Sequence, residues 1–477
     1  MHKAKHPTEK WYSGITRYQW LVLVVASLGW IFDVFEGQIF VASMREAMPS
    51  LAPESADDGR IALYNNIALG CFLLGGSLGG ILFGILSDRI GRKQTMMITI
   101  IFYTFFTCIS AFSQQWWHLA GLRFLVALGV GGEWAVASSL VAEVFPKKAR
   151  AHVDGIFHAS SVLGSYLAVA AGAFLIGNTA VHAWANSPEM NWVSAFMDPS
   201  SLPWRIGFTL GALPAFLIIW IRKSLREPKS WIDARQRATE QPDERMGAIS
   251  DLFKGVLLRR TLLGIALATI GLATFWGTHI YGKDVFRIAV EKRILADAVA
   301  GESTELTVES QIEVNPSQLA ASLKRSEMLG MFLVTTGGGI GLLCFGPLSQ
   351  RMGRRGAFYF YQLGGLVSSL FLFLAPLDVG ILYYVLPLFG FLTLGMHAGY
   401  AIYFPELYPT RLRATGTGFC FNGGRILAAP VLIISGIMQD DWGLSLTNAA
   451  TVLSLLFLVG IAILPFIPET NGRELPD

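Results

Sequence analysis

Twelve segments of about 20 mainly apolar residues recur along this 477-residue chain, and they constrain its fold more than any other feature. Charged residues make up only 15% of the chain, and the mean hydropathy is +0.48. This balance excludes an ordinary soluble enzyme of the same size. The sequence therefore predicts an all-α membrane protein with twelve transmembrane helices. These helices begin near Gln19, Asn65, Thr95, Trp116, His152, Arg205, Thr261, Glu327, Phe358, Ile381, Ala414 and Leu444.

Basic residues are distributed unevenly between alternate connections. Four short connections hold eleven Lys and Arg residues, whereas three counterparts on the opposite side hold none. Cytoplasmic loops carry the excess of Lys and Arg, so both termini are predicted in the cytoplasm of a multi-pass protein of the plasma membrane, or of the cell inner membrane in a bacterium. The net charge of +3 follows from this asymmetry and does not indicate a nucleic-acid partner. The basic connections are 88–93, 145–150, 351–355 and 411–413; the counterparts are 115–118, 377–380 and 438–443.

Sites for metals, cofactors and nucleotides are not expected. All four cysteines fall within predicted helices and lack metal-ligand spacing. The glycine-rich stretches GGSLGGILFG and TTGGGIG lie within apolar spans and lack a Walker lysine, so their glycines are interpreted as helix-packing residues.

The chain contains an internal repeat. GILSDRIGRK at 84–93 matches GPLSQRMGRR at 346–355, and EVFPKKARAHVDG at 143–155 matches ELYPTRLRATGTG at 406–418. The two offsets, 262 and 263 residues, are nearly equal. Each half therefore carries six helices in the same order, and the even number keeps the two copies parallel.

The repeat predicts two pseudo-symmetric six-helix bundles. The first covers residues 1–223, a polar cytoplasmic linker covers 224–256, and the second covers 257–477. The second bundle includes an outer-loop insertion at about 283–323, expected to be partly helical, which is either a plain loop insertion or a cap over the outer mouth.

The order Gly84, Leu86, Asp88, Arg89, Gly91, Arg92 and Lys93 resembles the signature loop of the major facilitator superfamily. Further stretches, including RFLVALGVGGEW, PELYPTRLRATG and PETNGREL, resemble the group that holds sugar porters and proton-coupled organic acid symporters. The seventh helix reads GLATFWGTHIYGKD and lacks the amide cluster of sugar porters. FDVFE together with GGEW is instead similar to symporters of lactate-like and sialate-like acids.

The resemblance also implies a gate at the cytoplasmic helix ends. In that family, interdomain salt bridges there hold the outward-open state and break on the inward transition. Positive-inside topology alone explains the arginines, but not the repeated Glu-to-Arg spacing of seven. Since Gln350 stands where Asp88 recurs, the latch is expected to be asymmetric. The gating residues that the resemblance assigns are Gly84, Asp88, Arg89, Gly91, Arg92, Glu143, Arg150, Arg351, Arg354, Glu406 and Arg413.

Two carboxylates, Asp33 and Glu36, interrupt the first apolar segment within GWIFDVFEGQIF. An ionised Asp at the centre of a spanning helix costs about 2.5–3.5 kcal/mol on insertion scales, so both should face protein or a water-filled cavity. Three residues apart, they share one face of the helix. They are either a buried structural pair or a functional site.

Arg123 is the predicted partner of Asp33. Asp33 lies about 21 Å along the first helix, and Arg123 lies about 20 Å above the inner face on the fourth, so their depths agree. An arginine within hydrogen-bond distance favours the carboxylate, and its withdrawal favours protonation. By the resemblance, Asp33 carries the proton and Arg123 modulates it; alternatively, Arg123 is a structural pin. Glu36 and Glu133 are further candidates for proton coupling, and Glu133 could equally cap neighbouring backbone.

Arg425 is the candidate for binding the substrate. It is the only basic residue deep in the helices of the second half, and a guanidinium suits bidentate capture of a carboxylate. The alternative is an ion pair with an acid such as Glu36. Ordinary packing is an alternative for each of the other candidates, which are Trp276, His279, Tyr400, His158, Asn422 and His397.

These observations predict a secondary transporter that imports a small organic anion with protons by alternating access. Its partners would be the substrate, protons and the bilayer, with no nucleotide, and it is expected to be a monomer. A transporter of a neutral sugar or polyol is the alternative within transport, and loss of anion binding on Arg425→Ala would discriminate the two. A non-transporting membrane receptor is the alternative from another class.

Overall fold

The computed structural model describes residues 12–146, 149, 153, 156–228, 232, 233, 236, 249–302, 316–408, 413–471 and 473. Within these residues the secondary structure is helical, and no strand occurs. The α-helices of the first half are α1 (Arg17–Ala47), α2 (Asp58–Ile90), α3 (Arg92–Ser110), α4 (Trp116–Val144), α6 (Ser161–Ala171), α7 (Thr179–Ala185), α8 (Leu202–Thr209) and α9 (Ala215–Ser224). Those of the second half are α11 (Gly255–Gly277), α12 (Gly282–Glu302), α13 (Pro316–Leu374), α14 (Val379–Leu394), α15 (His397–Tyr403), α16 (Arg413–Asp440), α17 (Leu446–Ser454) and α18 (Leu456–Ile463).

The helices are those of a protein that crosses a membrane several times. Nine segments of the described chain are long and apolar enough to span a bilayer. One of them, Gln318–Leu374, holds two helices that meet at Gly353, where φ is +79°. Helices α3 and α4 add further segments of 19 and 29 residues. This arrangement agrees with the twelve predicted spans and confirms the predicted all-α membrane fold.

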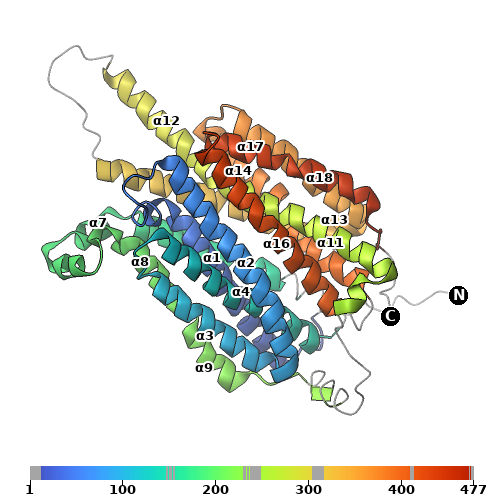
Figure 1. Cartoon of the computed structure of the whole chain (residues 1–477). Helices are drawn as coiled ribbons and strands as arrows, with labels where there is room; N and C mark the ends of the chain where they lie inside the picture. The colour runs from blue at the N-terminus through green and yellow to red at the C-terminus, as the bar shows by residue number, and fades with distance from the viewer. Residues whose placement is uncertain are drawn as a thin grey trace.

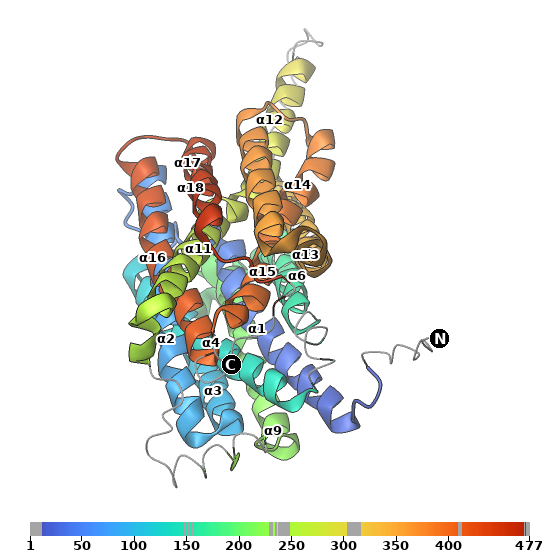
Figure 2. The ribbon, with the colours of Figure 1, turned by 90° about the vertical axis from the view of Figure 1, so that its right-hand side faces the viewer.

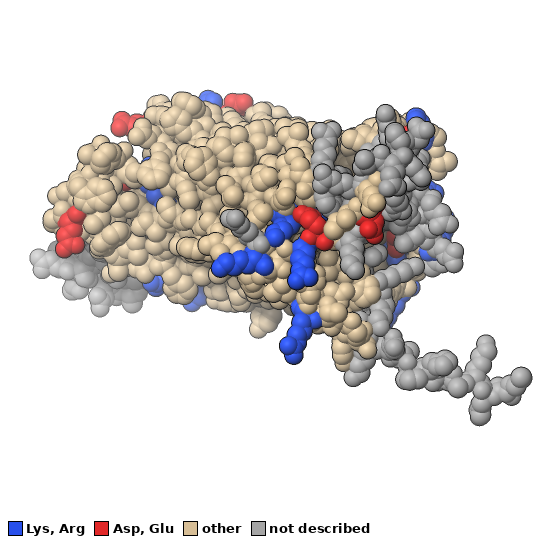
Figure 3. Space-filling model, turned by 90° about the horizontal axis from the view of Figure 1, so that it is seen from below, with Lys and Arg blue, Asp and Glu red and all other residues tan. Residues whose placement is uncertain are grey.

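The outer surface of the bundle is apolar. Large side chains such as Leu82, Phe105, Phe174 and Phe216 are 58–75% exposed. In water this exposure would be costly, whereas in a bilayer these side chains meet lipid tails. Charged side chains are sparse on the face shown in Figure 3, where most of the surface is uncharged.

The two halves lie side by side, α1 to α9 in one group and α11 to α18 in the other (Figure 1). They meet where α2 packs against α16 and where α6 packs against α13. Helix α12 projects past the other helices at one end of the bundle, away from α9 (Figure 2). This is the end at which α1 finishes, and it is the predicted outer end.

Within the described residues the outer-loop insertion is helical, in line with the expectation that part of it is. Helix α12 covers Gly282–Glu302, and α13 already begins at Pro316, so much of the predicted loop is helical. Residues 303–315 lie outside the described part. The break between α11 and α12 is a 3-10 turn, His279–Tyr281, which carries one of the candidate histidines.

Candidate functional site

The two carboxylates of α1 lie in the interior of the protein. The exposed fraction is 1% for Asp33 and 0% for Glu36. The neighbours of these two carboxyl groups differ, although the residues are only three positions apart.

Glu36 is the partner of Arg123. Nη1 of Arg123 donates to Oε1 of Glu36 at 2.7 Å, and Nη2 donates to Oε2 at 2.5 Å. The Thr107 hydroxyl donates to Oε1 at 3.0 Å. A bidentate, charge-assisted pair is among the strongest hydrogen-bond arrangements available. The predicted pairing of Arg123 with Asp33 is therefore wrong, because the guanidinium is held by the other carboxylate of the same helix.

Three aromatic rings complete the surroundings of Arg123. Its guanidinium carbon lies 5.4 Å from the ring centre of Phe40, 5.0 Å from that of Phe72 and 5.6 Å from that of Phe208. The side chain is 0% exposed. Ring faces attract a cation and exclude water from it, so they strengthen the ion pair with Glu36.

Asp33 has no cationic partner among the described residues. Among the described residues, neither carboxyl oxygen of Asp33 has a hydrogen-bond partner, and no ion pair includes it. The charged groups that act on it are two further carboxyl groups, those of Glu133 and Glu36. The buried Tyr103 hydroxyl is its polar neighbour and lies near enough to interact with it, although the two groups are not in hydrogen-bond geometry in the described structure. An ionised carboxylate in such a place is costly unless it gains a proton or a partner.

Glu133 reaches the same region from α4. It is 0% exposed, and the Thr99 hydroxyl donates to its Oε2 at 3.2 Å. Its Oε1 has no partner among the described residues and lies against Gly29, where a Cβ atom would be only 2.5 Å away. Gly29 precedes Asp33 by about one turn of α1. The absence of a side chain at Gly29 thus makes room for the second unpaired carboxyl group.

Arg425 and Asn422 of α16 face the glycine face of α2. A Cβ atom at Gly76 would lie 2.9 Å from Nη1 of Arg425, and one at Gly80 would lie 2.7 Å from Nδ2 of Asn422. Arg425 packs over the Phe421 ring at 5.1 Å and has no carboxylate partner within the described structure. An ion pair of Arg425 with Glu36 is excluded here, because Glu36 binds Arg123.

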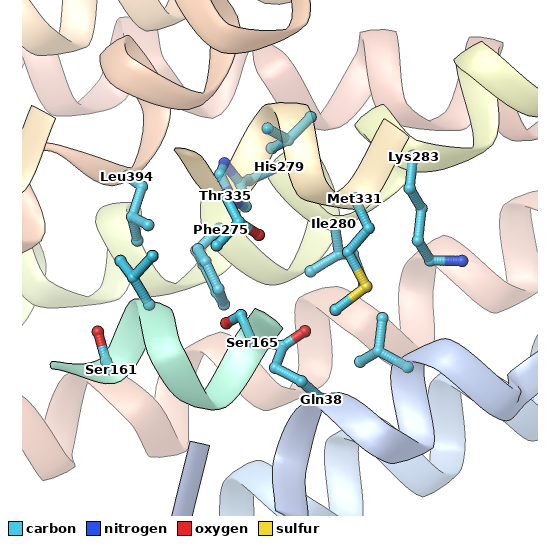
Figure 4. Close-up of a pocket in the computed structure, with 13 residues that line it drawn as sticks. Gln38, Ser161, Ser165, Phe275, His279, Ile280, Lys283, Met331, Thr335 and Leu394 are labelled. Carbon is cyan, nitrogen blue, oxygen red and sulfur yellow. The ribbon is translucent and has the colours of Figure 1, made fainter. Parts of the chain in front are cut away.

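A cavity lies between the two halves (Figure 4). Side chains of α1 and α6 form its wall in the first half, and side chains from α11 to α14 form the wall in the second. Its apolar side chains include Phe275 and Met331. Its polar members are Gln38, Ser161, Ser165, His279, Lys283 and Thr335.

His279 is the predicted substrate residue that lines this cavity. Its Nδ1 lies 2.6 Å from the Thr393 hydroxyl, and its ring stacks on Phe275 with centres 4.8 Å apart. His397 also contacts Phe275, at 5.3 Å between ring centres, and its Nε2 is 3.2 Å from the Gly271 carbonyl oxygen. Both histidines therefore pack against Phe275 of the cavity wall.

Aromatic contacts continue from the cavity wall to Arg425. His397 contacts Tyr400 at 5.5 Å between ring centres, and Tyr400 contacts Phe421 at 6.3 Å. Arg425 in turn packs on Phe421. The predicted residues His397, Tyr400 and Arg425 thus form a contiguous group behind the cavity.

Three other predicted residues serve packing in this structure. Trp276 packs against Phe72 at 6.2 Å, and His158 lies among aromatic rings that include Trp30 and Trp134. Asn422 is 4% exposed at the contact of α16 with α2. Their roles in binding stay predictions.

Sequence reasoning missed most of the polar cavity residues. Gln38 stands two positions after Glu36, in the stretch already singled out for its charges. Ser161 and Ser165 are four residues apart and so share one face of an otherwise apolar helix. Both patterns can be recognised in the sequence. Lys283 and Thr335 carry no comparable signal, because one follows a helix break and the other sits in a glycine-rich run.

The signature loops of the two halves have the same local structure. Gly91 has φ of +110° and Gly353 has φ of +79°, a region that favours glycine. After Gly91, the Glu227 carboxylate accepts hydrogen bonds from the backbone N–H groups of Arg92 and Lys93, at 2.8 and 3.1 Å. A carboxylate at a helix N-terminus satisfies donors that the helix leaves open and matches its dipole.

Glu469 does the same in the second half. It accepts hydrogen bonds from the backbone N–H groups of Arg354 and Arg355, at 2.9 and 3.0 Å. Partial burial raises the pKa of this carboxyl, but four backbone N–H groups outweigh it and hold the pKa below its ordinary value. The sequence stretches REP and PET thus supply equivalent caps.

The cytoplasmic gate is only partly within the described residues. Arg354 pairs with Glu406 at 2.7 Å, and both belong to the second half, so this pair does not cross the halves. Arg351 is exposed. The side chains of Asp88, Arg89, Glu143 and Arg413, and the whole of Arg150, lie outside the described part. The interdomain latch, including the roles of Gly84, Gly91 and Arg92, therefore stays a prediction.

Known proteins resemble this chain over nearly its whole length. The family model described as Major Facilitator Superfamily matches residues 37–431. A probable 4-methylmuconolactone transporter of Cupriavidus pinatubonensis is 26% identical, over 97% of this chain and 93% of that protein. A sialic acid transporter of Escherichia coli is 26% identical, over 95% and 96%, and a niacin transporter of Acinetobacter baylyi is 25% identical, over 97% and 96%.

The fold is also that of a solved transporter. A D-xylose–proton symporter superposes with a TM-score of 0.67 at 15% identity, covering 96% of this chain and 100% of that one. At this identity the likeness establishes the fold alone. The matched family and the relatives are transporters rather than enzymes.

Proposed function

Because the chain belongs to the major facilitator superfamily, we propose that this transporter imports a small organic anion together with protons. The two halves would rock about the cavity between them, exposing it to each side of the membrane in turn. Both the proton coupling and the anionic substrate go beyond membership of the family.

The buried carboxyl of Asp33 carries the proposal of proton coupling. It has no cation and no hydrogen bond among the described residues, so its ionised form is unsupported in this arrangement. Both terminal nitrogens of the Arg123 guanidinium donate to Glu36. A movement that lets water or a cation reach Asp33 would stabilise the ionised form, and the reverse movement would favour protonation. Asp33 can therefore bind a proton in one state and release it in the other.

Glu133 is the second proton-coupling candidate. It is buried beside α1, its Oε1 is unpartnered in the described structure, and it interacts electrostatically with Asp33. Two neighbouring carboxyl groups that lack cations cannot both ionise cheaply. Glu36 and Arg123, which form an ion pair with each other, are not proposed to exchange a proton.

Arg425 supports an anionic substrate. A guanidinium that has no carboxylate partner within the described structure and lies behind the cavity adds a positive potential that favours an anion there. Sialic acid and niacin, which two relatives are named for carrying, are both carboxylic acids. A relationship near 25% identity favours the class of substrate and leaves the individual acid open.

The test is uptake into proteoliposomes under an imposed proton gradient. The labelled acids are nicotinate, cis,cis-muconate and sialic acid, supplied one at a time. For the acid that is transported, Asp33→Asn should abolish accumulation against its gradient, because no proton can leave an amide. Exchange of internal for external acid should continue, since it needs no net proton movement.

The matched control is Asp378→Asn, which removes an exposed carboxylate that makes no capping hydrogen bond. It should accumulate acid like the wild type. Uphill accumulation by Asp33→Asn equal to the wild type would sink the assignment of the proton to Asp33. No uptake of any of the acids by the wild type would count against an organic anion as substrate.

A further inference from the structure

A chain of six charged side chains closes the predicted outer end of the molecule. Arg45 and Glu46 come from the end of α1, Lys283 and Asp284 from the start of α12, and Lys324 and Glu327 from the first turns of α13. Positive and negative groups alternate along it, so each interior member has two partners of opposite charge. None of the six was among the residues expected to be functional.

The individual contacts define the order of the chain. Arg45 binds Asp284 at 2.8 Å, and Lys283 lies 3.4 Å from Asp284 while it also binds Glu327. Lys324 binds Glu327 at 3.0 Å and Glu46 at 2.9 Å. The four members from α12 and α13 are at most 5% exposed, so their charges depend on one another for stabilisation.

Lys283 also belongs to the cavity. It stands at the edge opposite Ser161, and its nitrogen is turned away from the other labelled side chains (Figure 4). Among the described lining residues, it is the only lysine or arginine, and no aspartate or glutamate lines the cavity with it. Arg425 does not line this cavity.

The ammonium of Lys283 has unused capacity. An ammonium group has three N–H donors. Its two acceptors in the described structure are oxygen atoms of Glu327 and Asp284. The Asp284 contact is long, at 3.4 Å, and Asp284 is bound more closely by Arg45. One donor is thus free, and a second is weakly engaged.

From this geometry we propose that Lys283 binds the carboxylate of the transported acid and so determines the preference of the cavity for anions. The inference rests on the proposed function, since it requires an anionic substrate. The ion-pair chain acts as the support: Glu327 fixes the ammonium, and Arg45 draws Asp284 away from it. The carboxylate adds one charge-assisted hydrogen bond at the edge of the cavity.

The test compares binding to the full-length protein in lipid nanodiscs, measured by isothermal titration calorimetry. The probes are nicotinate, cis,cis-muconate and sialic acid, with nicotinamide as the uncharged counterpart of nicotinate. For the acid that binds, Lys283→Gln should lower the affinity by about 10- to 100-fold, the range expected for a lost hydrogen bond to a charged group. Lys283→Arg should retain most of the affinity.

Lys324→Gln is the matched control. It removes the other buried lysine of the same ion-pair chain, which lies outside the cavity wall, so it disturbs the chain without touching the ligand. Its affinity for the acid should stay within about threefold of the wild type, well below the loss expected for a direct contact.

The outcomes separate the two proposals. An equal loss of affinity in Lys283→Gln and Lys324→Gln would overturn direct binding and leave only a structural role for the chain. Acid binding unchanged in Lys283→Gln would overturn the assignment while the proposed function stands. Wild-type protein that binds nicotinamide but no acid would overturn both.

Discussion

At the scale of single residues, the pair formed by Glu36 and Arg123 should behave as one unit. Removal of one partner from a buried ion pair leaves an uncompensated charge and costs roughly 3–5 kcal/mol. Glu36→Gln alone should therefore lower the thermal unfolding midpoint of the purified protein strongly. The double variant Glu36→Gln with Arg123→Gln should recover part of that loss, because neither charge is then left alone.

Four proteins are compared in one detergent and at one pH: the wild type, both single variants and the double variant. Additive shifts of the unfolding midpoint would contradict the pairing. Asp33→Asn serves as the contrasting single variant. It removes a carboxylate that has no cationic partner among the described residues, so it should not destabilise the protein and should stabilise it where Asp33 is ionised.

The sequence could place Arg123 at the depth of the acids but could not choose between them. Asp33 and Glu36 are separated by about 4.5 Å along the helix axis and share a face. An arginine side chain is long enough to reach either. The choice is made by Thr107 and by the rings of Phe72 and Phe208, which come from helices other than α1. The depth of Arg123 along the helices follows from its position in the sequence. The contacts that side chains of other helices make with it follow from the packing of the folded chain.

At the scale of elements, the glycines of α2 allow it to pack closely against α4. Gly75 and Gly79 face α4, where a Cβ atom would lie 2.1 Å from the Phe124 carbonyl oxygen and 1.9 Å from that of Leu128. Gly79→Ala should therefore force the two helices apart and destabilise the protein by about 1–3 kcal/mol or more. The measurement is the thermal unfolding midpoint and the yield of monodisperse protein.

Gly121→Ala on α4 is the control for helix propensity. This glycine is exposed, and a Cβ atom there meets nothing within 4 Å. Alanine should stabilise the helix slightly, by about 0.4–1 kcal/mol, because it reduces the freedom of the unfolded chain. Opposite signs for the two glycine-to-alanine changes are the expected result. A stable Gly79→Ala protein would mean that α2 and α4 are not packed this closely.

Elements were predicted well where they are apolar and poorly where charges lie near a helix end. The interpretation of GGSLGGILFG as helix-packing glycines agrees with the close contacts of α2. The start of α12, with Lys283 and Asp284, falls instead in the outer-loop insertion expected at about 283–323, and the next span is expected from near Glu327, three residues after Lys324. Hydropathy counts each charge separately. It cannot register that these four neutralise one another in the folded chain.

At the scale of the whole molecule, two contacts tie the first half to the second at the predicted outer end. They are the ion pairs of Arg45 with Asp284 and of Glu46 with Lys324. If the halves part there, Arg45 and Glu46 leave together as a neutral pair. The four charges of α12 and α13 also sum to zero and keep their mutual contacts. Parting therefore strands no buried charge, which suits a contact that must open and close repeatedly.

This division predicts the effect of breaking one crossing pair. Arg45→Gln should destabilise the closed outer end and expose the cavity more often from outside. A cysteine introduced at Ser165, in the cavity wall, reports this exposure through its rate of reaction with a membrane-impermeant maleimide. The protein without the introduced cysteine gives the background from the four native thiols. The reaction should be faster in Arg45→Gln than in the otherwise unchanged parent.

Arg287→Gln is the matched control. Arg287 pairs with Glu291 at 3.2 Å within α12, so this ion pair does not connect the two halves. The substitution should leave the reaction rate of the Ser165→Cys thiol unchanged. Equal rates in Arg45→Gln and Arg287→Gln would show that the closed end does not depend on the crossing pair, because the loss of any arginine near α12 would then have the same effect.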